Sequence, residues 1–284
     1  MVHGKSIELF LVNGTADSLI TAELSNWNGK AIKIPRIEVA SCNRDDLAQV
    51  GVYFLFSKDD KDADSVYIGE SENVKERLIQ HIQNEIIEWH TAVIFTGRNL
   101  NKALIRYLEY RLVQIARDCV RYNVLTKNTY ATTIKESEIA TMEEFIDNVK
   151  VLINTLGFKV LEPIKQPNNS LNKGTQEDES LELAIGDIKA YGNVSPEGFV
   201  VYKGSSVNKE TKQSLSKTYK TLRTKLIDTK KIVDFQATED ILFTSSSAAA
   251  ATLLGYPASG PKCWKNSKGL SLKEIEAKQI DDYS

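Results

Sequence analysis

Four side chains suited to acid–base or phosphate chemistry lie close together in the sequence: Tyr53, Tyr67, Arg77 and His81. Arg77 and His81 are four residues apart, so on a helix they share one face. A planar guanidinium matches a phosphate and the extra charge of its transition state. Both tyrosines fall in apolar stretches typical of strands, so their phenols can converge with that face. Without the tyrosines, the same pattern would indicate an ordinary solvated helix face.

A carboxylate stands at an unexpected place on a later helix. The pattern of residues 101–117 predicts an apolar stripe that includes Ile105, and Glu109 lies on that stripe. A lone carboxylate there is costly unless it is paired or binds a metal. Arg106 or Arg111 would satisfy the first condition. A single hard divalent cation, Mg²⁺ or Mn²⁺, would satisfy the second, with waters and phosphate oxygens as further ligands, and we favour the metal.

The two tyrosines need help to act as bases. A free phenol, with a pKa near 10, is a poor base at neutral pH. A nearby arginine and a metal ion would favour the phenolate and make a base plausible. We therefore expect Tyr53 to be the base and Tyr67 to position the site. Alternatively, His81 takes the proton, either directly or through Tyr53.

Two tripeptides, Gly51-Val52-Tyr53 and Tyr67-Ile68-Gly69, resemble the motifs of the GIY-YIG nuclease family, with valine replacing the first isoleucine. The family's pattern continues with an arginine, a histidine one turn later, a metal-binding glutamate and a downstream asparagine. These positions are matched by Arg77, His81, Glu109 and either Asn128 or Asn123, of which we favour Asn128.

The resemblance spans residues 48–160 and implies a metal-dependent endonuclease that hydrolyses phosphodiester bonds in DNA. In this hypothesis Tyr53 and Tyr67 activate water, Arg77 stabilises the transition state, and Glu109 binds the metal. One metal carboxylate is evident, so a two-metal site is not indicated. Two alternatives remain: a non-catalytic nucleic-acid-binding or scaffold protein that keeps this fold, and a nuclease acting on structured RNA.

The elements that must position these residues form an α+β pattern. Strands are predicted at 51–56, 65–69 and 91–95, and helices at 101–117 and 142–156. A further helix should begin near Ser71 or Asn73, because either residue can cap it. The resemblance implies a small mixed sheet flanked by helices. Residues 1–47 read as a short N-terminal β extension, 161–184 as a linker and 185–284 as a small α+β domain.

The C-terminal part, from Leu242 through Asn266, resembles a small domain of unknown function that often follows GIY-YIG domains in bacterial proteins. Between residues 201 and 234 it carries nine Lys or Arg against three acids, a local excess of +6. Such spacing is able to track a phosphate backbone, although a solvated lysine-rich helix explains it equally well. The expected nucleic-acid-binding residues are Lys217, Lys220, Arg223 and Lys225.

Composition limits the remaining classes. The chain has 284 residues, which favours two domains, and its 36 basic and 38 acidic residues give a net charge of −2. This balance excludes a globally basic nucleic-acid coat. The three cysteines lack metal-ligand spacing, and apolar runs are too short for a membrane span, so we expect a cytoplasmic protein. Target sequence and oligomeric state are not encoded in any visible pattern.

Overall fold

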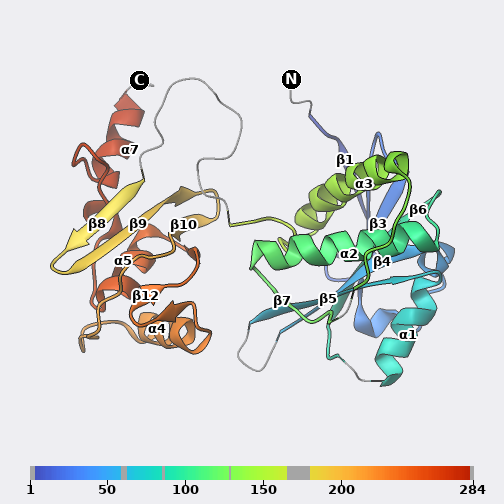
Figure 1. The fold of residues 1–284 in the computed structure, drawn as a ribbon, viewed down its shortest axis with the longest axis horizontal. Helices are drawn as coiled ribbons and strands as arrows, with labels where there is room; N and C mark the ends of the chain where they lie inside the picture. Colours follow the sequence, from blue (N-terminus) through green and yellow to red (C-terminus); the bar gives the residue numbers. More distant parts are fainter. Residues whose placement is uncertain (1–3, 59–62, 85–86, 128, 165–179, 282–284) are drawn as a thin grey trace. The chain divides into compact units, whose positions relative to one another are not determined.

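The computed structural model describes residues 4–58, 63–84, 87–127, 129–164 and 180–281 (Figure 1). The chain divides into two compact units, Met1–Pro163 and Ile164–Ser284, and each is described by itself. No helix in these described ranges is both long and apolar enough to cross a membrane.

Unit 1 is built on a mixed seven-stranded sheet in the order β1-β2-β3-β6-β4-β5-β7, counted over the described residues. Neighbouring strands run antiparallel except β5 and β7, which are parallel. The strands are β1 Ile7–Leu11, β2 Ile20–Leu24, β3 Gly29–Pro35, β4 Gly51–Lys58, β5 Asp64–Ser71, β6 Thr91–Gly97 and β7 Asn123–Val124. The strands of the expected N-terminal extension thus belong to the same sheet as the two tyrosine-bearing strands.

Helices cover both faces of this sheet. They are α1 Val74–Asn84, α2 Lys102–Cys119 and α3 Glu136–Thr155, with short 3₁₀ turns at Arg36–Glu38 and Asp45–Ala48. Helices α2 and α3 lie side by side over one face of the sheet (Figure 1). Their apolar faces share one buried cluster with alternate residues of the central strands. The opposite sheet face packs against α1 in a second cluster that contains Tyr53 and partly buried Tyr67. The alternation of side chains along each strand therefore separates the two tyrosines from the α2–α3 core.

Local signals explain where the helices begin and end. The Asn73 side chain accepts a hydrogen bond from the Glu76 N–H at 3.2 Å, just before α1. Asn101 caps α2 in the same way. Gly157, with φ of +96°, follows α3, as expected for a helix stop. However, α3 begins at Glu136, where Lys135 is the N-cap residue, rather than at residue 142 as predicted. The first turns lack a strong apolar pattern, so the sequence did not indicate them.

Unit 2 has a four-stranded sheet in the order β13-β10-β9-β8 and a separate β11–β12 pair, within the described residues. Its elements are β8 Leu181–Ile185, β9 Ile188–Ser195, β10 Gly198–Val201, α4 Lys217–Asp228, β11 Ile232–Val233, β12 Gln236–Ala237, β13 Ile241–Phe243, α5 Ser246–Leu254, α6 Gly260–Cys263 and α7 Leu272–Asp281. The alanine-rich α5 and the fully buried Trp264 lie in its core. The whole chain is therefore an α+β protein with a C-terminal domain.

The expected linker differs from the structure at both ends. Strand β8 begins at Leu181, whose side chain is buried in the unit 2 core. At the other end, Leu161 is buried in the unit 1 core. Composition missed both because a few apolar residues beside a long polar stretch do not change its average. Residues 165–179, the centre of the expected linker, lie outside the described residues.

Candidate active site

Tyr53 and Tyr67 are brought together by the pairing of β4 with β5. Their register places Tyr53 opposite Gly69 and Leu55 opposite Tyr67, so both phenols point to the same face of the sheet. The two ring centroids are 6.2 Å apart. Tyr53 is only 1 % exposed, whereas Tyr67 is partly exposed. The sheet therefore presents a buried and a more accessible phenol side by side.

His81 reaches these phenols from α1. Its Nε2 lies 2.9 Å from the Tyr53 hydroxyl oxygen, and its ring centroid is 5.2 Å from that of Tyr67. His81 is 4 % exposed, and burial together with the positive charge of Arg77 lowers its pKa to about 4. At neutral pH the imidazole is therefore uncharged. When Nε2 is the unprotonated nitrogen, the Tyr53 hydroxyl donates to it and keeps its oxygen lone pairs for another partner.

Without a metal ion, the environment of Tyr53 favours the neutral phenol. Burial and the neighbouring Tyr67 raise the pKa of Tyr53 well above its usual value. Interaction with Arg77 lowers that pKa, as expected, but does not outweigh the burial. Tyr53 is thus a neutral phenol hydrogen-bonded to a neutral imidazole, and the expectation that a metal ion favours the phenolate stays a prediction.

Arg77 lies one turn before His81 on α1 and is partly exposed. Burial lowers its pKa, but interactions with Tyr53 and Tyr67 outweigh this effect and the pKa is raised. Its Nη1 also donates to the Gln80 side chain at 3.0 Å. The sequence-predicted face of α1 therefore does converge with both phenols, and its guanidinium stays charged and reachable.

The glycines of the two motifs have a steric reason. A Cβ at Gly69 would lie 2.5 Å from the Tyr53 hydroxyl oxygen, and one at Gly51 would lie 2.4 Å from the Phe95 carbonyl oxygen. Real Cβ atoms do not approach so closely, and the Phe95 atom belongs to the backbone and cannot swing away. Val52, which replaces the family's isoleucine, is fully buried and therefore acts in packing.

Glu109 lies on α2, on the stripe formed by fully buried Ile105, Leu112 and Ala116. The carboxylate itself is partly buried. Its expected arginine partners bind elsewhere. Arg106 Nε lies 3.8 Å from a Glu70 oxygen, and Arg111 binds Glu143 through Nε at 2.7 Å and Nη2 at 3.2 Å.

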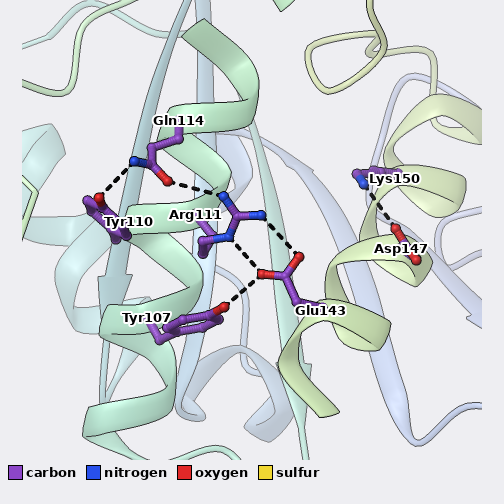
Figure 2. A network of polar contacts seen from close by, with 7 residues as sticks. All are labelled: Tyr107, Tyr110, Arg111, Gln114, Glu143, Asp147 and Lys150. Carbon is purple, nitrogen blue, oxygen red and sulfur yellow. Dashed lines mark hydrogen bonds and ion pairs between the residues drawn. The ribbon is translucent and has the colours of Figure 1, made fainter. Parts of the chain in front are cut away.

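The Arg111–Glu143 pair belongs to a network that joins α2 to α3 (Figure 2). The Tyr107 hydroxyl donates to Glu143 at 2.7 Å, and Arg111 also donates to Gln114 at 3.1 Å. This network takes Arg111 away from Glu109. Among the residues that the structure describes, the Glu109 carboxylate makes no hydrogen bond or ion pair, so the pairing alternative is wrong for Arg111 and Arg106.

Glu70 is a residue near this site that sequence reasoning missed. It directly follows Gly69 on β5 and binds Lys102 Nζ at 2.8 Å. Burial and the negative charge of Glu70 raise the pKa of Glu109 to about 7, against the opposing effects of Lys102, Arg106 and Arg77. The one sequence signal for Glu70 was its position directly after the second motif. That signal was weak because neighbouring residues of a strand point to opposite faces of the sheet, so Glu70 was not expected on the same side as the motif residues.

This setting fits a divalent cation. Glu109 combines partial burial, no partner among the described residues and a pKa raised by another carboxylate, all of which a bound cation would relieve. No group of three or more potential ligand side chains occurs within the described ranges. A cation held by Glu109 alone would take water and phosphate oxygens as most of its ligands, a coordination that Mg²⁺ accepts.

The asparagine of the pattern is not assigned. Asn128 lies outside the described residues. Asn123 is exposed on β7 and pairs with Ser65 of β5. Ser65 lies four residues before Gly69, which is about 13 Å along the strand. Between them, the buried Thr126 hydroxyl accepts from Ile68 N–H and donates to Ile68 O, both at 2.8 Å. This contact ties the chain beside position 128 to the middle of the second motif.

The expected nucleic-acid-binding residues of unit 2 lie on α4 but differ in environment. Lys217 is exposed, and Lys220 and Lys225 are partly exposed. Arg223 is only 4 % exposed, and its Nη1 donates to the Thr252 carbonyl at 2.7 Å, at the C-terminal end of α5. Our expectation of a solvent-facing Arg223 is therefore wrong, because its side chain joins two helices inside the unit.

Comparison with known proteins adds one finding on unit 2. Residues 181–276 match the family described as Domain of unknown function (DUF4357). This match agrees with the C-terminal resemblance noted in the sequence and covers about a third of the chain. No curated protein and no solved structure matches the chain. The resemblance of residues 48–160 to GIY-YIG nucleases stays a prediction.

Proposed function

We propose that residues 48–160 form a GIY-YIG-type endonuclease domain that hydrolyses phosphodiester bonds in DNA with one Mg²⁺ or Mn²⁺ ion. The observation that carries this proposal is the meeting of Tyr53, Tyr67, Arg77 and His81 at one face of β4 and β5, beside a carboxylate without a partner among the described residues. A hydrophobic core does not require two phenols, an imidazole and a guanidinium in contact, whereas cleavage of a phosphate ester can use each of them.

The proton route follows from the geometry. With Nε2 of His81 unprotonated, the Tyr53 hydroxyl donates to it. As that proton passes to the neutral imidazole, the Tyr53 oxygen, which also interacts with Arg77, would accept a proton from a water molecule. Tyr67, the more exposed phenol, orients the water and the phosphate. This route replaces a pre-formed phenolate, which the burial of Tyr53 disfavours.

Charge stabilisation would come from the two sides of the site. Arg77, held charged by its neighbours, would donate to the phosphate oxygens as negative charge builds up. Glu109 would hold the divalent cation, which supplies Lewis-acid stabilisation of the phosphate and the leaving oxygen. Glu70 and Lys102 would keep the surroundings of Glu109 ordered through their 2.8 Å ion pair.

For unit 2 we propose a role in binding the nucleic acid through Lys217, Lys220 and Lys225, without Arg223. Neutralising the three lysines together should flatten the dependence of DNA affinity on salt, because fewer counterions are released on binding. The single variant Glu210→Gln, on an exposed acid of the same unit, serves as the control. An unchanged slope in the triple variant would assign these lysines to solubility alone.

The decisive test is nicking of supercoiled plasmid by the full chain with Mg²⁺ or Mn²⁺. Wild type should nick, Glu109→Ala should not, and Arg77→Ala should be slower by about 10²–10³-fold. Glu8→Gln, at an exposed position on β1, is the matched control and should nick normally. Normal cleavage by Glu109→Ala would overturn the metal assignment. Cleavage of structured RNA in preference to DNA of the same shape would move the substrate class to RNA.

A further inference from the structure

A hollow of about 240 Å³ lies at one end of the unit 1 sheet. It is lined by the β2–β3 loop, the loop after β6 and residues 141–145 of α3. The residues used below are Trp27, Asn28, Arg98, Asn99 and Phe145, and we refer to this site as the Trp27 hollow. Pockets for drug-sized ligands are usually about 300–1,000 Å³, so this one suits a single flat ring system.

Trp27 forms a rigid aromatic wall of the hollow. A Cβ on Gly29 would lie 2.3 Å from the Trp27 ring, so the indole packs directly on the glycine backbone. Phe145 meets the same ring edge-on, with centroids 4.8 Å apart. Part of the indole remains exposed and lines the hollow. A fixed, partly exposed aromatic ring is a surface on which nucleobases stack.

Polar groups at the mouth are available for a ligand. Asn28, Arg98 and Asn99 are exposed, and within the described ranges their side chains form no hydrogen bond or ion pair. Each amide offers both a donor and an acceptor, which is the pattern on the edge of a nucleobase. A guanidinium is suited to the adjoining phosphate. The hollow thus combines a stacking wall, base-edge groups and a cation, and the exposed Glu144 carboxylate also lines it.

The hollow lies at the same end of the sheet as the candidate active site. At this end of the sheet, Gly29 of β3 pairs with Gly97 of β6, and the neighbouring Thr96 of β6 pairs with Gly51 of β4. Gly51 in turn pairs with Ser71 of β5, two residues after Gly69. The loop that carries Arg98 and Asn99 leads directly into α2.

The first turn of α2 then continues toward Glu109. Its Lys102 binds Glu70 at 2.8 Å, and Glu109 follows seven residues later, about 10 Å along the helix. The loop residues that line the hollow therefore lead into the helix that carries Glu109, so one strand that follows α2 would pass both.

We propose that the Trp27 hollow binds one nucleobase and its phosphate, contributed by the same DNA strand that is cleaved beside Glu109. This inference rests on the proposed function. A free nucleotide has the same chemistry, so the experiment includes both sources.

Intrinsic fluorescence gives a direct readout because the other two tryptophans, Trp89 and Trp264, are 3 % and 0 % exposed. Titrating the full chain in EDTA with a short mixed-sequence single strand should quench Trp27, and Trp27→Phe should abolish the quench. A dAMP titration separates the sources. Quenching by dAMP only at much higher concentration assigns the hollow to the strand, whereas equal or tighter binding of dAMP overturns that assignment.

Affinity for the labelled strand, measured by anisotropy, tests the side chains separately. Trp27→Ala should weaken binding about 5- to 150-fold, the range for loss of one stacked base. Because that variant also loses packing against Phe145, Arg98→Ala and Asn28→Ala are measured as well. Arg98→Ala should reduce the salt slope by about one. Arg36→Ala makes the same charge change at the opposite end of β3, and it should neither weaken strand binding nor reduce the salt slope.

The results separate the two proposals. Wild-type affinity in all three hollow variants, or quenching that persists in Trp27→Phe, would overturn the nucleobase site. Metal-dependent nicking without any Trp27 quench would reject the hollow alone. Quenching and strand binding without nicking on any substrate would instead reject the proposed cleavage and leave the hollow as a nucleobase site.

Discussion

Replacing Glu109 by glutamine should stabilise unit 1 at alkaline pH in the absence of metal. Burial and the charge of Glu70 raise the pKa of Glu109 from 4.5 to about 7. A group whose pKa is raised by folding contributes stability that is complete below pH 4.5 and is lost as the pH rises through 7. Above pH 7 the folded protein therefore carries an unfavourable carboxylate, which the neutral, nearly isosteric glutamine removes.

The size of the effect follows from the shift. A rise of about 2.5 pKa units corresponds to about 3.4 kcal/mol between the charged and neutral forms. Because Glu109 is partly exposed, solvent screening reduces this value, and we expect a gain of about 1–3 kcal/mol at pH 8. For a unit of this size that gain corresponds to a rise in Tm of about 2–12 °C.

Calorimetric unfolding of the full chain in EDTA at pH 8 and pH 4.5 measures this directly. The gain of Glu109→Gln should be present at pH 8 and absent at pH 4.5, and Glu8→Gln should show no gain at either pH. Adding Mg²⁺ should raise the Tm of wild type but not that of Glu109→Gln. A Glu109→Gln variant no more stable than Glu8→Gln at pH 8 would refute our account of a buried carboxylate that is ready to bind a metal.

Three further predictions concern other positions. Burial and Arg77 lower the pKa of His81 from 6.5 to about 4, so between these pH values the unfolded chain binds a proton that the folded chain does not. The free energy of unfolding, measured in urea, should therefore fall as the pH drops from 6.5 to about 4, and His81→Gln should reduce this fall. Gly69→Ala places a Cβ 2.5 Å from the Tyr53 hydroxyl, so plasmid nicking should fall more than about tenfold while the circular dichroism spectrum stays unchanged. Undiminished nicking would show that Tyr53 can move freely. Arg223→Ala leaves the Thr252 carbonyl without its buried donor, so the free energy of unfolding of unit 2, measured in denaturant, should fall by about 1–3 kcal/mol. The salt dependence of DNA binding should not change, and a weaker salt dependence would place Arg223 on the binding surface.

Much of the local structure was readable in advance. The strand pattern at 51–56 and 65–69, the helix start near Ser71 or Asn73 and the stop at Gly157 all lie within or beside the elements observed, and the structure selects Asn73 as the cap. These features depend on side-chain alternation, on one hydrogen bond within a helical turn and on the φ that glycine tolerates. Neighbours in the chain decide all three, so the sequence is sufficient for them.

The electrostatic environment was less readable. Sequence spacing allowed Arg111 to pair with Glu109, but the structure joins it to Glu143, 32 residues away. Arg223 looked like one cation of a basic helix, yet it is buried against the Thr252 carbonyl, 29 residues away. Each outcome depends on which helix packs beside which, and no local pattern encodes that.

By itself, the sequence determined the order of strands and helices, the glycines of both motifs, and a helix face that carries Arg77 and His81 beside two phenols. Only the tertiary structure decided the protonation behaviour of that group, because the pKa values of Tyr53 and His81 follow from burial. It also brought Glu70 near Glu109. Burial and charge–charge distance are properties of the packed chain, since they arise between residues that only folding brings into contact.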